Sequence, residues 1–223
     1  IEVSSNVAVA KLAFNNYGHA AKKFYNHLND FGFTKKIDVE IAGAGSPVIA
    51  KPELWSGVSS AFIAHGYELQ ITPLHTLQFY NAIANNGVLV KPTFIEKVTH
   101  YSKTVDSTIT VSSNILSERT VTELRSILEG VVENGTALNL KTDYLQIAGK
   151  TGTTQNNSDG WFMGITPELV SGVWAGCEDR AVHFRTTQLG QGANVALPVW
   201  GLYMKKVYAD PTLNYSKGGF EPP

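Results

Sequence analysis

The sequence predicts an α+β fold in which helices come first, antiparallel strands come late and a further helix closes the chain. Three observations carry this prediction. Apolar residues recur at helical spacing in residues 6–30 and 72–86, two short apolar segments at 159–165 and 170–175 flank a turn, and helical spacing returns at 196–207. Strands grouped after helices, rather than alternating with them, favour α+β over a doubly wound α/β fold.

Two of the helices carry clear start and stop signals. Thr72 is a candidate N-cap, Pro73 suits the first helical position, and Asn86-Gly87 ends the same helix. A second helix is predicted from Ser117 to Asn134-Gly135. Both helices therefore have bounds that the sequence itself defines.

The remaining segments are predicted to be irregular or extended. Gly and Pro punctuate residues 31–60, which indicates an irregular connection with short strands. Residues 88–112 alternate enough to be extended, and residues 145–154 form a strand candidate ahead of the two late ones. The tail 210–223 is rich in Pro, Gly and Ser and is predicted to be irregular.

Size and composition suit one large domain. The chain has 223 residues, with 43% hydrophobic and 17% charged, and its formal net charge of -1 gives no overall field to recruit nucleic acid or an anionic membrane. The lone Cys177 excludes an internal disulfide framework. The start Ile1-Glu2-Val3-Ser4 has no signal-peptide character, so we expect a cut inside a longer protein, with any anchor upstream.

The first chemical signal is Lys150-Thr151-Gly152-Thr153-Thr154 at the end of a predicted strand. Gly152 has no side chain, so a substrate backbone can lie against the strand there. Lys150 can hold a carboxylate or bias a proton transfer, and the hydroxyls of Thr151 and Thr153 can bind a carboxylate. The Thr153 N–H can point at a developing oxyanion. A bare Lys-Thr-Gly is weak by itself, because it equally fits a polar strand end.

The second signal is Ser4-Ser5-Asn6, directly before an apolar helical run. Ser4 and Asn6 have the form Ser-x-Asn, whose hydroxyl and amide can relay a proton and orient an amide substrate. Ser and Asn are also favoured at helix N-caps, so a purely structural role fits as well. A second Ser-Ser-Asn, at 112–114, is interpreted as a loop.

These motifs, in this order, resemble the transpeptidase domain of high-molecular-weight penicillin-binding proteins. The segments between them, Gly66–Lys91 and Glu129–Ala137, resemble the corresponding blocks of the family. Up to about residue 150 the chain resembles class B members, and after it class A members. The resemblance implies a penicillin-binding protein/serine β-lactamase-like fold, of which this chain would be a C-terminal portion.

The resemblance also implies a function. Family members cross-link peptidoglycan stem peptides through an acylated serine, bind β-lactams and need no metal or organic cofactor. Ser4, Asn6 and Lys150 would be catalytic residues, and Thr151, Gly152 and Thr153 would bind substrate. The expected place is the bacterial cell envelope, on the extracytoplasmic face, with an anchor outside this sequence and with cell-division or elongation proteins as partners.

One family motif is missing. Family members carry Ser-x-x-Lys, in which the serine is the nucleophile, but no serine in this sequence has a lysine three residues later. We therefore expect the nucleophile upstream of Ile1 and an inactive fragment. Two alternatives stay open: a non-catalytic module that binds peptidoglycan or a division partner, and a D,D-carboxypeptidase or β-lactam sensor of the same fold. A domain without its opening strands would also expose a sheet edge that favours self-association.

Overall fold

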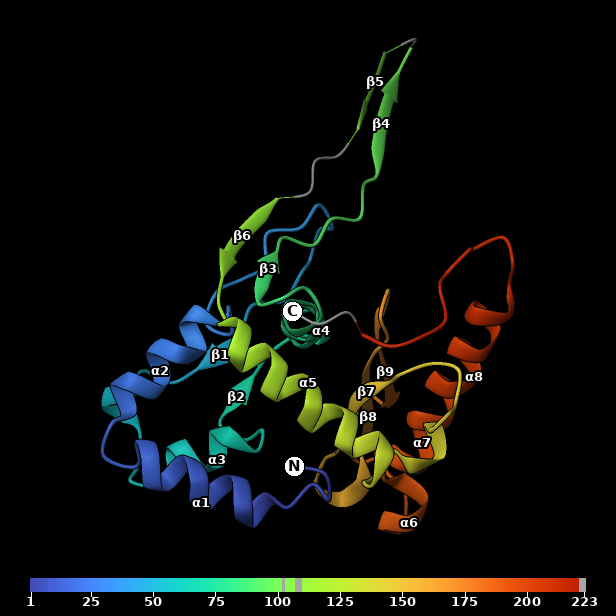
Figure 1. Ribbon diagram of the computed structural model, residues 1–223. Coiled ribbons are helices and arrows are strands. Elements are labelled where there is room, and N and C mark those ends of the chain that lie inside the picture. Colours follow the sequence, from blue (N-terminus) through green and yellow to red (C-terminus); the bar gives the residue numbers. More distant parts are fainter. Residues whose placement is uncertain (102, 107–109, 221–223) are drawn as a thin grey trace. The chain divides into compact units, whose positions relative to one another are not determined.

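The computed structural model describes residues 1–101, 103–106 and 110–220 and divides the chain into two compact units. We call the first, Ile1–Ser4 with Ser117–Pro223, the sheet unit, and the second, Ser5–Leu116, the helical unit. Helices dominate the helical unit, and the longest strands lie in the sheet unit, which confirms the predicted α+β class (Figure 1).

Three antiparallel strands form the sheet of the sheet unit. They are β7 (Ala148–Thr153), β8 (Asp159–Ile165) and β9 (Val170–Gly176), in the spatial order β7-β8-β9. The three late strand predictions are thereby confirmed. The predicted turn between β8 and β9 closes with a 2.8 Å hydrogen bond from Thr166 N–H to the Leu169 carbonyl.

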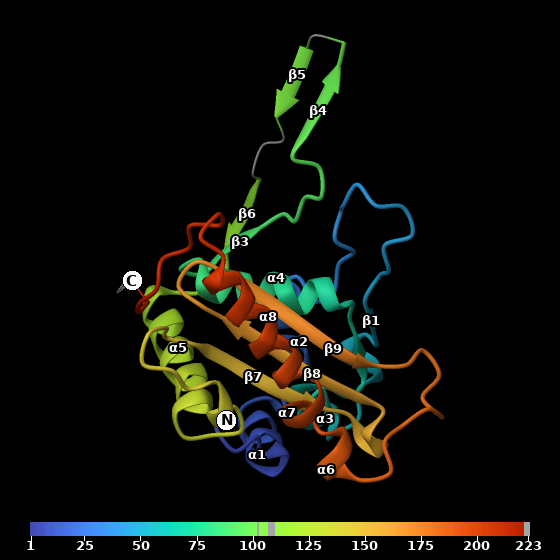
Figure 2. The same cartoon turned by 90° about the vertical axis from the view of Figure 1, so that its right-hand side faces the viewer.

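Helices pack against this sheet. Helix α8 runs along β8 and β9, as Figure 2 shows, and α5 packs against β7. The indole of Trp200 on α8 is fully buried against Phe162 of β8, with ring centroids 5.1 Å apart. The helices of the unit are α5 (Glu118–Glu133), α6 (Thr187–Gly190), α7 (Gly192–Val195) and α8 (Leu197–Ala209), with 3-10 turns η2 (Leu138–Leu140) and η3 (Gln155–Asn157).

The helical unit contains four α-helices in its described residues, and the predicted ones are present. They are α1 (Asn6–Tyr17), α2 (Ala21–Asp30), α3 (Ser59–Ala64) and α4 (Pro73–Ala84), with the 3-10 turn η1 (Pro52–Leu54) and the strand pair β1 (Val48–Ile49) and β2 (Leu69–Gln70). Helix α3 begins inside the segment predicted to be irregular. With only six residues it is too short to display helical periodicity.

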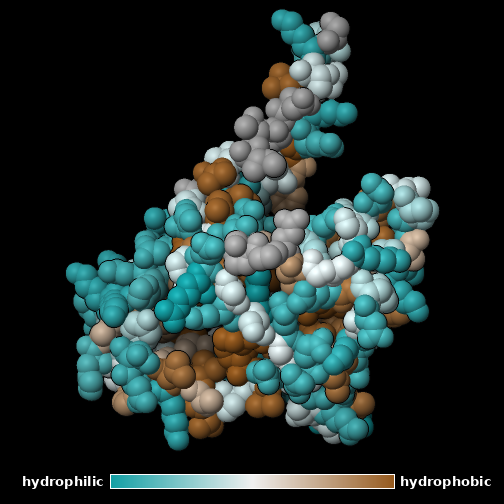
Figure 3. Space-filling model, in the orientation of Figure 1, coloured by the Kyte–Doolittle hydropathy of each residue, from teal (hydrophilic) through white to brown (hydrophobic). Residues whose placement is uncertain are grey.

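The predicted extended stretch 88–112 becomes two strand pairs. Strand β3 (Val88–Val90) pairs with β6 (Val111–Asn114), and β4 (Lys97–His100) pairs with β5 (Lys103–Asp106). The β4–β5 hairpin carries apolar side chains on its surface, and Figure 3 shows them in brown; Val98 and Val105 are exposed cross-strand partners. Residues 102 and 107–109 of the stretch lie outside the described residues.

Two predictions need correction. Ser112-Ser113-Asn114 lies in β6 and not in a loop, because Ser113 and Asn114 pair with β3 and Ser112 lies at a register shift in the same strand. Thr72 precedes α4 as predicted, but within the described chain its hydroxyl makes no cap bond and lies 2.7 Å from Nδ1 of the buried His75. Gly87 ends α4 with φ +85°, a left-handed conformation that favours glycine.

The tail 210–220 is largely irregular, with one bridge between Leu145 and Gly218, and its last residues, 221–223, lie outside the described part. None of the helices in the described ranges is both long and apolar enough to cross a membrane.

Candidate active site

Lys150 occupies the third position of the edge strand β7, in the sheet unit. Its Nζ donates hydrogen bonds to the Ser4 hydroxyl at 2.7 Å and to the Thr151 carbonyl at 2.8 Å. Burial disfavours the charged ammonium and lowers the Lys150 pKa to about 8. A lysine with this pKa exchanges its proton near neutral pH more readily than an exposed lysine does.

The three residues of Ser4-Ser5-Asn6 occupy different positions and make different contacts. Ser5 is the N-cap of α1, and its Oγ accepts a hydrogen bond from Ala8 N–H at 3.3 Å. Ser4 is thereby not needed as a cap and meets Lys150, with its backbone in the left-handed region at φ +54°. Asn6 is the first residue of α1 and belongs to the helical unit, so the structure joins only Ser4 to Lys150.

The outward-pointing groups of β7 follow from strand alternation. Thr154 N–H donates to the Asp159 carbonyl, so the backbone N–H and carbonyl of Thr154 point toward β8. Because this direction alternates along a strand, the backbone groups of Gly152 and Lys150 also point toward β8. The Thr153 N–H and the Thr151 carbonyl therefore point away from β8, to the side of β7 on which the described residues place no other strand. This edge offers a backbone N–H, a carbonyl and the Lys150 ammonium to a ligand that lies along it.

The two threonine hydroxyls are held by partners within the sheet unit. Thr151 Oγ1 lies 2.7 Å from Thr136 Oγ1, which follows α5. Thr153 Oγ1 accepts a 3.0 Å hydrogen bond from the backbone N–H of Gly192, at the start of α7. The Thr153 oxygen acts as the acceptor in this bond, so the hydroxyl proton is not used in it and can be donated to an acceptor such as a carboxylate.

Gly152 lies directly opposite Trp161 of β8. A Cβ added at Gly152 would come within 3.1 Å of the Trp161 Cβ. With glycine at this position, no side chain stands between a ligand and the backbone of the edge strand. The Trp161 ring lies 6.2 Å from that of Trp174 on β9, and the two indoles form one wall beside the motif.

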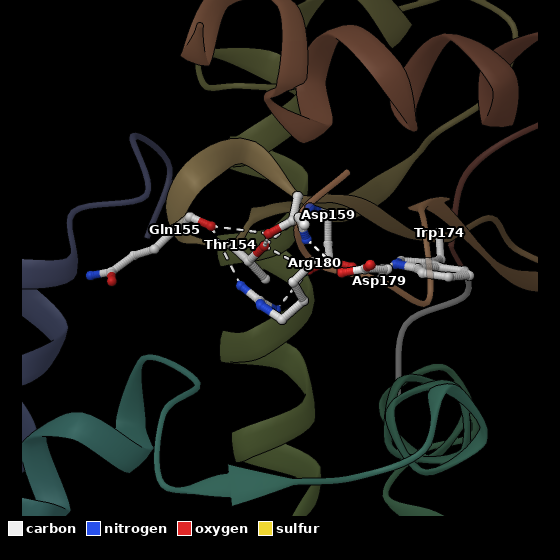
Figure 4. A network of polar contacts seen from close by, with 8 residues as sticks. Thr154, Gln155, Asp159, Trp174, Asp179 and Arg180 are labelled. Carbon is white, nitrogen blue, oxygen red and sulfur yellow. Dashed lines mark hydrogen bonds and ion pairs between the residues drawn. The ribbon is translucent and has the colours of Figure 1, made fainter. Parts of the chain in front are cut away.

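Several residues that support the motif were not predicted from the sequence. Asp159, at the start of β8, accepts hydrogen bonds from Thr154 Oγ1 at 2.7 Å and from Trp174 Nε1 at 2.9 Å (Figure 4). It also pairs with Arg180 at 3.0 Å. The sequence places Asp159 next to the motif, but only the β7–β8 turn aims its carboxylate back at Thr154.

Comparisons with known proteins show the family to which the chain belongs. A family model described as the penicillin binding protein transpeptidase domain matches residues 1–176. This chain belongs to the penicillin-binding-protein transpeptidase family. It is similar to penicillin-binding protein 1A of Aquifex aeolicus, with 33% identity over 159 residues that make up 70% of this chain and 20% of that protein. It is also similar to stage V sporulation protein D of Bacillus subtilis, with 31% identity over 146 residues, or 64% of this chain and 22% of that protein.

Solved structures confirm the predicted penicillin-binding-protein-like fold. The D,D-transpeptidase domain of a peptidoglycan glycosyltransferase from Eggerthella lenta superposes with a TM-score of 0.75 at 24% identity, covering 93% of this chain and 52% of that one. Penicillin-binding protein 3 of Mycobacterium tuberculosis, complexed with aztreonam, gives 0.74 at 24% identity, with 99% and 51% covered. The chain thus spans about a fifth of these curated relatives and about half of these solved chains.

Proposed function

We propose that this chain is part of a D,D-transpeptidase domain that cross-links peptidoglycan stem peptides and is acylated by β-lactams. The observation that carries the proposal is the 2.7 Å bond from Lys150 Nζ to Ser4 Oγ at the free edge of β7. Ser4 accepts that bond, so its own proton remains free for a leaving amine. The similar protein from Mycobacterium tuberculosis, solved with aztreonam, supports β-lactams as ligands.

In the proposed reaction, a serine oxygen attacks the carbonyl carbon of a D-Ala-D-Ala bond and gives up its hydroxyl proton. The C–N bond breaks, the D-Ala amine leaves with one proton supplied through Ser4, and an ester to the enzyme serine forms. The amine of a second stem peptide then attacks this ester and forms the cross-link, and the proton that this amine loses returns to the freed serine oxygen. The Thr153 N–H would stabilise the oxyanion, and Lys150 with the Thr153 hydroxyl would bind the terminal carboxylate.

The nucleophile is proposed to lie outside this 223-residue sequence, because no serine here precedes a lysine by three positions. The parent protein would then act in the bacterial cell envelope, on the extracytoplasmic face. We expect the 223-residue chain alone to take up no stoichiometric penicillin. An acyl adduct on it, seen by intact-mass spectrometry, would contradict this part of the proposal.

The neighbouring serines provide a matched test in the parent protein. Ser4→Ala should slow acylation by a fluorescent penicillin by about 100-fold, the range of a lost proton relay. Ser5→Ala should change acylation by less than about three-fold but lower stability by about 1 kcal/mol, because only the α1 cap is lost. Equal acylation rates for both variants would remove Ser4 from the mechanism, and a wild-type parent that takes no label would argue for the non-catalytic alternative.

A further inference from the structure

The segment between β9 and α7, residues 177–191, lies at the surface but is attached to the β7–β8 turn at several points. Arg180, early in the segment, reaches Asp159. Phe184 N–H, in its middle, donates to the Asn157 carbonyl at 3.2 Å. Gly192, directly after the segment, donates to Thr153 Oγ1. The end of β7, the β7–β8 turn and the start of β8 therefore contact the beginning and the middle of the segment and the residue that follows it.

Asp159 is the centre of the first attachment, as Figure 4 shows. Its side chain is 13% exposed, whereas that of Arg180 is 61% exposed. The carboxylate takes hydrogen bonds from Thr154 Oγ1, Trp174 Nε1 and Arg180 Nη1, while Asp159 N–H donates back to Thr154 Oγ1 at 3.0 Å. Arg180 also contacts the Gln155 carbonyl through Nη2 at 3.4 Å. One charged group of β8 thus joins the residue after β7, strand β9 and the segment.

The last attachment depends on close backbone contact. A Cβ added at Gly192 would lie 2.2 Å from the Gly152 carbonyl oxygen and 2.4 Å from that of Trp161, so only glycine fits there. A Cβ at Gly190 would meet Asn157 Cβ at 2.6 Å. Glycine at positions 190 and 192 therefore lets the end of the segment pack directly against Asn157 and the β7–β8 ladder, where the Gly192 N–H reaches Thr153 Oγ1.

We propose that Asp159 and Arg180 are positioning residues: their ion pair holds residues 177–191 against the β7–β8 turn, which keeps Gly192 N–H on Thr153 and the Thr153 proton directed at an anionic ligand. This inference rests on the proposed function for the identity of that ligand, a carboxylate. An ion pair with so exposed an arginine adds little stability alone. Its effect is on the direction of the Thr153 hydroxyl, whereas the Thr153 backbone is held by the pairing of β7 with β8, so we expect a change in ligand binding rather than in the acylation step.

The attachment itself can be tested in the parent protein without any activity. Arg180→Ala should speed hydrogen exchange at the Phe184 and Gly192 amides by roughly ten-fold or more, because local opening becomes easier. Exchange at Phe162, in the middle of β8, should not change. Arg185→Ala is the matched control, since it removes an arginine from the same exposed segment. Unchanged exchange at Phe184 and Gly192 in Arg180→Ala would overturn the attachment.

Binding is tested by the concentration dependence of acylation by a fluorescent penicillin. In Arg180→Ala and Asp159→Asn we expect the half-saturating concentration to rise by about five- to thirty-fold and the limiting rate to change by less than about two-fold. Arg180→Lys, which keeps the charge, should lie between wild type and Arg180→Ala. Asp179→Asn is the control for charge, because that neighbouring carboxylate accepts a hydrogen bond from Ala181 N–H, two residues on, at 2.8 Å.

The outcomes separate the two proposals. A fall in the limiting rate with an unchanged half-saturating concentration would overturn the positioning role while leaving the transpeptidase function intact. The same holds if Asp179→Asn has an equal effect. A wild-type parent that takes no label would contradict the proposed function and with it the carboxylate ligand, and hydrogen exchange alone would then decide whether Arg180 holds the segment.

Discussion

Among single side chains, Lys150 shows most directly how burial changes the pKa of a side chain. Burial lowers its pKa to about 8, from 10.5 in an exposed lysine. Below pH 8 the lysine is charged in both states, and the folded protein carries the cost of the partly buried charge. Between about pH 8 and pH 10.5 only the unfolded chain keeps this proton, so the stability contribution of Lys150 rises with pH.

This gives the first prediction. Between pH 7.5 and pH 10.5, the free energy of unfolding of the wild type should gain about 1 to 3 kcal/mol relative to Lys150→Met, allowing for solvent screening of a partly exposed group. Urea unfolding of both proteins at each pH measures the difference, and other titrating groups cancel in it. A difference that stays flat across this range would show that the ammonium is not desolvated.

The motif residues also show what a sequence can reveal at this scale. Ser4 and Lys150 were each predicted to be catalytic, through separate motifs, and the Lys150 Nζ lies 2.7 Å from the Ser4 Oγ. The roles of Ser4, Asn6, Lys150, Thr151, Gly152 and Thr153 stay predictions. Asp159 and Gly192 were missed because their contacts with the motif arise from a turn and from a segment 39 residues away, which no spacing rule encodes.

Single elements are most predictable where a cap defines them. Ser117 was predicted to start a helix, and its Oγ accepts from Thr120 N–H at 3.2 Å at the N-terminus of α5. Ser117→Ala should therefore lower stability by about 1 kcal/mol, as a lost N-cap does. Ser126→Ala, at an exposed position inside the same helix, should be neutral or slightly stabilising. Thermal unfolding of both variants makes the comparison, and similar losses would mean that the cap contributes nothing.

Two glycines at contacts between elements, Gly192 and Gly201, should respond to alanine substitution in opposite directions. Gly192→Ala places a Cβ against two carbonyl oxygens of the β7–β8 ladder and should lower stability by about 1 to 3 kcal/mol. Gly201→Ala, within α8, meets only the end of the Leu140 side chain at 2.8 Å, which can turn aside. It should gain up to about 1 kcal/mol from helix propensity. Urea midpoints decide this, and a Gly192→Ala protein as stable as Gly201→Ala would show that α7 is free to shift.

Elements without local signals were the ones that the sequence left out. Helix α3 has too few turns for periodicity, and β6 is recognisable only through its partner β3. The strands of the sheet unit were predicted because apolar runs and the turn at Thr166 coincide. An element is therefore easier to predict when its own residues stabilise it than when distant partners do.

At the scale of the whole molecule, the sheet of the sheet unit ends, among the described strands, in a second unpaired edge, on the side away from β7. Strand β9 is the outer strand opposite β7, and no other described strand pairs with its far edge. Continuing the alternation from Thr154 through β8, Val170, Gly172 and Trp174 point their N–H groups at that edge. An unpaired edge with such donors is a template for another strand, so self-association of the 223-residue chain is expected at high concentration.

The prediction is a concentration-dependent increase in mass by analytical ultracentrifugation, with slowed hydrogen exchange at Gly172 and Trp174 in the associated form. Val170→Pro should weaken association by about ten-fold or more, because it removes one outward donor at the first position of the strand, where the β8 ladder does not use it. Val48→Pro, on the two-residue strand β1 of the helical unit, is the control for a proline at an exposed strand valine. If Val48→Pro weakened association as much as Val170→Pro does, the effect would not be specific to the β9 edge. If the associated form instead protected β7 amides such as Thr153, the contact would lie on the free edge of β7, and a second chain would occupy the edge that we propose for substrate.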